Sequence, residues 1–244
     1  MDSSHANNIG MARFVNHFFD DPDICPHRYP RIGRTDGSGG KVRVAIDGFP
    51  IKLIINGQEM GIYTFNIDRY AFNNQGFSGE TSAVAYEIGT NSSLGSAAFM
   101  TDEWDNIASE FEYRYHYMGD EDAVTTKSAQ QNEDGSAVRV LKFGLHDELQ
   151  KLVTFLATCD NEEFRGSVGR SFLSIEHFID YFLLTYFFGL VDNLGKNMVL
   201  ATWERNSTGS FIWYPMFYDC DSMLGLTLAQ IKSTLIYGEN PMND

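Results

Sequence analysis

Two side chains with catalytic chemistry stand five residues apart in the second half of the chain. Asp192 and Asn197 open and close the sequence D-N-L-G-K-N. Protein-kinase catalytic loops use the same spacing: the aspartate accepts the proton of a substrate hydroxyl, and the asparagine gives Mg²⁺ a neutral oxygen ligand. Asp and Asn are also common in loops that do no chemistry, so this spacing alone is a weak signal.

Two more carboxylates, Asp219 and Asp221, are separated by a single residue. If residues 218–221 are extended, alternate side chains face the same side, and the carboxylates lie within about 7 Å of each other. Two like charges about 5 Å apart repel by roughly 3 kcal/mol at an effective dielectric near 20. A hard divalent cation, which takes oxygen ligands and suits phosphate substrates, would offset this repulsion. The alternatives are a salt bridge with Lys196 or Arg205, or plain solvation.

The order of these groups is more informative than any one of them. Asp192 comes first, Asn197 follows, a strand–turn–strand pattern comes next, and the D-x-D sequence with Gly225 ends the series. Protein kinases have the same order, with the metal-binding aspartate arriving after a short hairpin. The ordered set therefore favours metal-assisted phosphoryl transfer.

The elements around these residues are expected to hold them rigidly. Ser174 is a plausible N-cap for a helix with apolar residues on nearly every side, which predicts a central, buried helix. Gly189 and Gly195 permit a tight loop after it. Residues 198–203 and 211–218 then predict a hairpin around a polar turn. A buried helix that leads into a polar loop and a hairpin is a good platform for chemistry.

The rest of the chain predicts a mixture of helices and antiparallel strands. The strongest signal is Asn56-Gly57 between two β-rich runs, because both residues tolerate the positive φ of a type I′ hairpin turn. Apolar spacing predicts helices near residues 9–19 and 145–156, and short runs predict strands at 84–88, 111–117 and 138–143. The acidic run 102–122, with Arg114 as its one Lys or Arg, predicts a solvated face. No repeat or linker divides the chain, so a single domain over 1–244 is expected.

The composition predicts a folded protein with an acidic surface. The 244 residues are 43% hydrophobic and carry a formal charge of −15. That charge disfavours nucleic acids and anionic membranes as partners, because both need clustered Lys and Arg. Cys25, Cys159 and Cys220 are odd in number and far apart, which fits a reducing compartment, and Cys220 is expected to be a buried, inert thiol. No signal peptide or transmembrane segment is visible, which suits a cytoplasmic or virion-associated protein.

Residues 181–225 resemble the signature of the CotH family, atypical protein kinases named from a spore-coat protein. The resemblance rests on Y-F-L-L-T-Y-F-F-G-L-V-D-N-L-G-K-N-M-V-L and on W-Y-P-M-F-Y-D-C-D-S-M-L-G. The segment I-I-N-G-Q-E-M-G-I-Y-T-F-N-I-D-R is similar to the family's N-G-x-x-x-G-x-Y segment, and the opening D-S-S-H-A-N-N is similar to its Asp-Ser element. The likeness spans nearly the whole chain, and its wording is closest to CotH-like proteins of phages and gut bacteria.

The resemblance implies an α+β, kinase-like fold with antiparallel hairpins. It also implies transfer of the γ-phosphoryl group of ATP to Ser or Thr of a protein, with Mg²⁺ or Mn²⁺. Carried over to this sequence, Asp192 would be the catalytic aspartate and Asn197 a metal ligand. Asp219 or Asp221 would be the metal-binding aspartate, and the resemblance leaves the choice between them open.

Two departures from the family pattern bear on activity. Asn66 stands where many relatives have Glu. The family's strand with a phosphate-binding Lys would precede the D-S-S element, at which this chain begins, so an incomplete N-terminal strand region is expected. Lys52 and Lys196 are then the candidates for the nucleotide phosphates. The alternative function is a catalytically inactive, structural CotH-like protein of a virion or cell surface, and a metal-dependent nuclease or hydrolase is a third.

Overall fold

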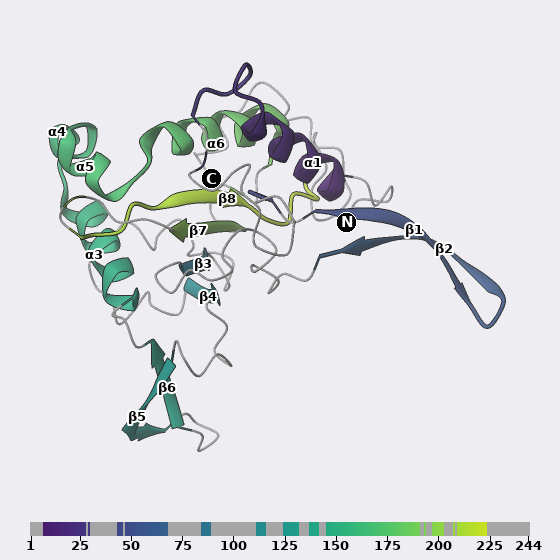
Figure 1. The fold of residues 1–244 in the computed structure, drawn as a ribbon, viewed down its shortest axis with the longest axis horizontal. Helices are drawn as coiled ribbons and strands as arrows, with labels where there is room; N and C mark the ends of the chain where they lie inside the picture. The colour runs from purple at the N-terminus through teal and green to yellow at the C-terminus, as the bar shows by residue number, and fades with distance from the viewer. Residues whose placement is uncertain are drawn as a thin grey trace.

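The fold combines α-helices with antiparallel β-sheets (Figure 1). A computed structural model of the chain describes residues 7–27, 29, 43–45, 47–67, 84–88, 111–115, 124–131, 137–141, 145–190, 193, 197–202, 207 and 209–223. These residues form one four-stranded sheet and two separate two-stranded hairpins. The predicted α+β class is therefore confirmed.

The four-stranded sheet is antiparallel and has the strand order β4-β3-β7-β8. Its strands are β3 (Val84–Ile88), β4 (Phe111–Tyr115), β7 (Met198–Thr202) and β8 (Tyr214–Phe217). β3 and β8 are buried at every residue. Strands that are buried on both faces appear in a sequence as continuous apolar runs rather than as alternation. This is why V-A-Y-E-I and Y-P-M-F show no period of two.

Alternate residues of the sheet belong to two hydrophobic clusters. Val84, Tyr86 and Ile88 pack in one cluster with apolar residues of α3 (Leu145–Thr158). Ala85, which lies between them, packs in the other cluster with apolar residues of α1 (Asn7–Asp20). Because successive strand residues point to opposite faces, α3 covers one face of the sheet and α1 covers the other.

The first hairpin, β1 (Gly48–Ile55) and β2 (Gln58–Asn66), projects away from the sheet (Figure 1). Its turn residues Asn56 and Gly57 have φ of +52° and +78°, the pair of positive values that a type I′ turn requires. The hairpin predicted from Asn-Gly is therefore confirmed. Phe49 pairs with Phe65 on one face, and their side chains remain 50% and 58% exposed.

Most other predicted elements are present with shifted ends, and two helices and a strand are additional. The second hairpin pairs β5 (Val124–Gln131) with β6 (Ala137–Leu141). β5 was not predicted, because V-T-T-K-S-A-Q-Q has no apolar alternation. The additional helices are α4 (Asn161–Arg165) and α5 (Ser167–Phe172).

A capping box starts α4. The Asp160 side chain accepts hydrogen bonds from the backbone N–H groups of Glu162 and Glu163, at 2.8 and 2.9 Å. The Glu163 side chain in turn accepts the backbone N–H of Asp160 at 3.1 Å. The D-x-x-E spacing that produces this reciprocal cap was readable in the sequence.

The long helix α6 (Ile175–Phe188) has apolar residues on nearly every side, but only one side of it is buried. One stripe at helical spacing is buried and consists of His177, Tyr181 and Thr185. Another stripe is more than half exposed and consists of Ile179, Leu183 and Phe187, at 52%, 56% and 62%. The expectation of a helix buried on all sides is therefore wrong for the described residues. None of the described helices has both the length and the apolar character to span a bilayer.

Candidate functional site

The pairing of β7 with β8 brings two of the predicted site segments side by side. Met198 at the start of β7 pairs with Phe217 at the end of β8. Asn197 therefore precedes β7 at the same end of the sheet where residues 218–221 leave β8. Asp219 and Asp221 are both partly exposed there. The structure thus places Asn197 and the D-x-D segment at one end of the four-stranded sheet.

A buried asparagine, Asn193, links these two segments. Its side chain is 1% exposed, and its Nδ2 donates to the backbone oxygens of Asn197 at 3.1 Å and Tyr218 at 2.7 Å. Its own backbone oxygen accepts the hydroxyl of Tyr181 at 3.0 Å. Tyr181 is a buried residue of α6. Asn193 therefore joins the loop after α6, the chain after β8 and α6 itself.

The side-chain oxygen of Asn193 is an additional buried donor atom for a ligand. Oδ1 has no hydrogen-bond partner within the described part of the structure. Such atoms are uncommon, because a buried oxygen that has lost its hydration costs roughly 1–3 kcal/mol. Hard cations accept amide oxygens as ligands. A cation or an ordered water would therefore satisfy Oδ1.

A left-handed glycine turns the chain from α6 toward this loop. Gly189 has φ of +64° and ψ of +40°, and its N–H donates to the backbone oxygens of Thr185 and Tyr186. The N–H of Leu190 also donates to Thr185, at 2.9 Å. These bonds satisfy carbonyl groups that the end of a helix leaves without partners. The loop that contains Asn193 therefore starts from a fixed point.

Asn197 and Asp219 both have left-handed backbones, with φ of +56° and +47°. Asn and Asp tolerate this region better than other non-glycine residues, but it is uncommon even for them. Such backbone conformations often occur at functional sites. The left-handed Asp219 also corrects the premise that residues 218–221 are extended. Simple alternation therefore no longer places the carboxylates of Asp219 and Asp221 on the same side.

The N-terminal end of α1 holds the D-x-D segment through its backbone. The side-chain oxygen of Asn8 accepts the N–H of Cys220 at 3.0 Å. The side-chain amide of Asn7 donates to the backbone oxygen of Asp221 at 3.3 Å. These contacts fix the backbone that carries the two carboxylate groups.

Cys220 is a buried thiol between the two aspartates, as predicted. Burial raises its pKa, the negative charges of Asp219 and Asp221 raise it further, and a hydrogen bond from Asn193 opposes them. The thiol is therefore protonated and unreactive at neutral pH. Because both carboxylates act on the same sulfur, their negative potential is concentrated in this small region.

Of the three remaining predicted site residues, the structure describes one. Asp192 and Lys196 lie outside the described residues. Lys52 is on β1, where its ammonium group is 2.7 Å from Glu59 and its side chain is 57% exposed. Lys52 is four residues along β1 from Gly48 at the root of the hairpin, a length of about 13 Å.

The oxygen donors at this end of the sheet suit a hard cation. They are the carboxylates of Asp219 and Asp221 and the side-chain oxygens of Asn193 and Asn197. Mg²⁺ prefers such oxygen ligands and keeps several waters, so it needs few groups from the protein. Across the described ranges, no three His, Cys, Asp or Glu side chains come together as a metal site. A cation here would therefore combine carboxylates with amide oxygens.

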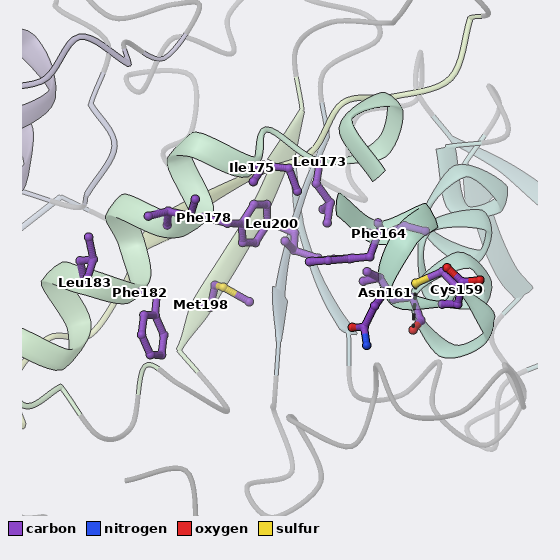
Figure 2. A pocket seen from close by; sticks show the side chains of 14 residues that line it. Cys159, Asn161, Phe164, Leu173, Ile175, Phe178, Phe182, Leu183, Met198 and Leu200 are labelled. Atoms are coloured by element: carbon purple, nitrogen blue, oxygen red, sulfur yellow. Dashed lines mark hydrogen bonds between the residues drawn. The ribbon is translucent and has the colours of Figure 1, made fainter. Parts of the chain in front are cut away.

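An apolar pocket of about 790 Å³ lies apart from this site, between α3, α4, α6 and β7 (Figure 2). Its walls are mainly hydrophobic and include Phe164, Phe178, Phe182, Met198 and Leu200. Of the described site residues, none lines it.

Sequence reasoning did not single out Asn193, Asn7 or Asn8. All three are inside motifs that the sequence analysis used, D-N-L-G-K-N and D-S-S-H-A-N-N. Their contacts with the chain after β8 span 25 residues for Asn193 and 212 residues for Asn8. No local sequence pattern indicates partners at such separations. The contacts of these asparagines become visible only where the structure brings the distant segments together.

Comparison with protein families gives one finding for this chain. Residues 46–243 match the family described as CotH kinase protein. The matched region contains both hairpins, the four-stranded sheet and every predicted site residue, whereas α1 precedes it. No curated protein matches the chain.

Proposed function

Because the chain belongs to the CotH kinase protein family, we propose that it is a protein serine/threonine kinase that uses ATP and Mg²⁺ or Mn²⁺. The observation that carries the proposal is the link that Asn193 makes between Asn197 and the chain leading into the D-x-D segment. Family membership supports the reaction class and a kinase-like arrangement of a single α+β domain. The link supports this end of the sheet as the place of reaction.

Asp192 is the proposed catalytic residue. In protein kinases the loop aspartate accepts the proton of the substrate hydroxyl as that oxygen attacks the γ-phosphorus. Asp192 directly precedes Asn193, whose amide bonds hold the loop against the end of β8. These bonds anchor the residue that follows the proposed proton acceptor in the sequence.

Asn197, Asp219 and Asp221 are the proposed metal-binding residues, with Oδ1 of Asn193 as a further oxygen donor. The fit rests on the all-oxygen donor set and on the negative potential that both carboxylates create around Cys220. A divalent ion bound there would neutralise charge on the β- and γ-phosphate oxygens. The protein's own contribution is to hold the hydroxyl, the phosphates and the proton acceptor in line.

Transfer of labelled γ-phosphate to a Ser/Thr-rich protein tests the proposal. The Asp192→Asn variant should lose about a hundredfold or more in rate, the range that general acid–base catalysis supplies. The Asp219→Asn and Asp221→Asn variants should differ in the Mg²⁺ concentration that activity requires. Replacing the residue that holds the ion should raise that concentration more. Asp147→Asn, at an exposed position of α3, is the matched control. A wild-type rate in the Asp192→Asn variant would remove the proposed role of Asp192.

The second candidate function is a catalytically inactive scaffold of a virion or cell surface. The exposed face formed by Phe49 and Phe65 on the projecting hairpin favours it, because such a face suits assembly. Thermal melting with ATP and Mg²⁺ separates the two functions. A nucleotide at a hundred times its Kd stabilises the folded state by about 2.7 kcal/mol. No shift at millimolar nucleotide favours the scaffold. A shift with metal that ATP does not increase favours the nuclease or hydrolase.

A further inference from the structure

Two arginines approach one aspartate at the root of the β1–β2 hairpin. Nε of Arg13, on α1, is 3.5 Å from Oδ1 of Asp47, and Nη2 of Arg13 donates to the backbone oxygen of Gly48 at 3.0 Å. Nη1 of Arg43 is 3.8 Å from Oδ2 of the same aspartate. Two positive charges therefore share one carboxylate.

The chain around Asp47 runs beside the end of β8. Ala45 forms a parallel bridge with Phe217, whose N–H donates to the backbone oxygen of Val44 at 3.0 Å. Asp47 and Asp219 each stand two residues beyond this bridge, a chain length of about 7 Å.

Helix α1 contacts both the D-x-D segment and the root of the β1–β2 hairpin. Asn8 binds the backbone of Cys220, and Arg13 is five residues further along the helix, an axial distance of about 7.5 Å. Figure 1 shows α1, the root of β1 and the chain after β8 meeting at one side of the molecule. The arginine pair and the D-x-D segment therefore both adjoin the Ala45–Phe217 bridge and α1.

Both guanidinium groups have capacity for an additional ligand. The Arg13 and Arg43 side chains are 57% and 39% exposed. A guanidinium has five N–H donors in a planar fork that matches phosphate oxygens, and the contacts described above use two of those on Arg13. On a chain of net charge −15, an anionic ligand needs a local excess of positive charge. Two arginines on one aspartate carry a net charge of +1, and a divalent ion at Asp219 and Asp221 would balance those two carboxylates.

We propose that Arg13 and Arg43, which share Asp47, form a subsite for the phosphate groups of the nucleotide. This inference rests on the proposed kinase function and gives the phosphates cations other than Lys52 and Lys196. It also gives α1 a part in ligand binding, because one of the two cations belongs to that helix.

Binding of two probes, each with saturating Mg²⁺, tests the subsite by calorimetry on the full chain. ATP reports on the proposed function, and inorganic tripolyphosphate reports on phosphate binding without the nucleoside. The Arg13→Gln/Arg43→Gln variant should bind tripolyphosphate roughly tenfold or more weakly, because hydrogen bonds to charged groups are lost. Arg165→Gln/Arg170→Gln makes the same change in net charge on α4 and α5 and should bind like wild type. Equal tripolyphosphate affinity in both double variants would overturn the inference.

The Asp47→Asn variant separates ligand binding from a structural role of the arginines. It removes the carboxylate that competes for both guanidinium groups, so tripolyphosphate should bind as tightly as to wild type or more tightly. If the arginines serve only to anchor the hairpin through Asp47, this variant should lose binding as the arginine double variant does, which would also overturn the inference. A wild-type chain that binds tripolyphosphate through Arg13 and Arg43 but does not bind ATP would refute the kinase function and leave the subsite standing.

Discussion

Replacing Asn193 with alanine is expected to lower the free energy of unfolding by about 2–4 kcal/mol. The side chain is 1% exposed and donates to two backbone oxygens, of Asn197 and Tyr218. Each oxygen would lose its donor, at a cost of about 1–2 kcal/mol per group. For a chain of this size, that loss corresponds to a fall in Tm of roughly 4–16 °C. Urea denaturation followed by tryptophan fluorescence measures the free energy directly.

Two further variants make this measurement decisive. Asn161→Ala, at the exposed start of α4, is the matched control and should stay within about 0.5 kcal/mol of wild type. Asn193→Asp keeps the size of the side chain but turns an acceptor toward the two backbone oxygens, so it should be at least as destabilising as Asn193→Ala at neutral pH. If Asn193→Ala is as stable as the Asn161→Ala control, the amide does not link the two segments and the site loses its organising contact.

Three further outcomes follow from the packing and the charges. Gly169→Ala should lower Tm, because the added Cβ would lie 1.9 Å from a backbone oxygen of α4. In Gly10→Ala the added Cβ meets no atom within 4 Å, so the free energy of unfolding should rise by about 0.5–1 kcal/mol. Equal Tm values for the two variants would contradict this packing. Arg114→Met should cost about 3–5 kcal/mol in urea denaturation, because it removes the arginine from its buried pair with Glu87. Adding Glu87→Leu should recover most of that loss, and a double variant no more stable than the single one would argue against the pair. Burial raises the pKa of Cys25 from 9.0 to about 11, so the folded state keeps its proton longer and stability should fall as pH rises from 9 to 11. A pH series of melting curves should show a smaller fall in Cys25→Ala, and parallel curves would refute the shift.

Elements with short-range signals were predictable from the sequence. The turn at Asn56-Gly57 was predicted because the residue types themselves select the positive φ that the hairpin needs. Gly189 was expected to permit a tight loop and is the left-handed end of α6 for the same reason. The hairpin expected between Asn197 and the D-x-D sequence is present as β7 and β8. Because an antiparallel hairpin returns the chain to the end from which it started, it brings the two segments to the same end of the sheet.

Features that depend on tertiary contacts were not predictable. The exposed stripe of α6 has the same residue types as its buried stripe, so composition could not distinguish them. Arg114 was expected to balance a solvated acidic run, yet it is 2% exposed and paired with Glu87 from the neighbouring strand. The left-handed Asp219 broke the assumed alternation of carboxylates. In each case the deciding neighbour is distant in the sequence or the backbone departs from its regular form.

The left-handed backbones of Asn197 and Asp219 allow an unusually clean separation of shape from chemistry. Glycine adopts φ values of +56° and +47° without steric penalty, so Asn197→Gly and Asp219→Gly would delete an amide and a carboxylate while leaving the main-chain path unstrained. Alanine at these two positions would instead keep a Cβ in a backbone conformation that disfavours it. At these two positions glycine is therefore the conservative truncation and alanine the disruptive one, the reverse of ordinary scanning practice.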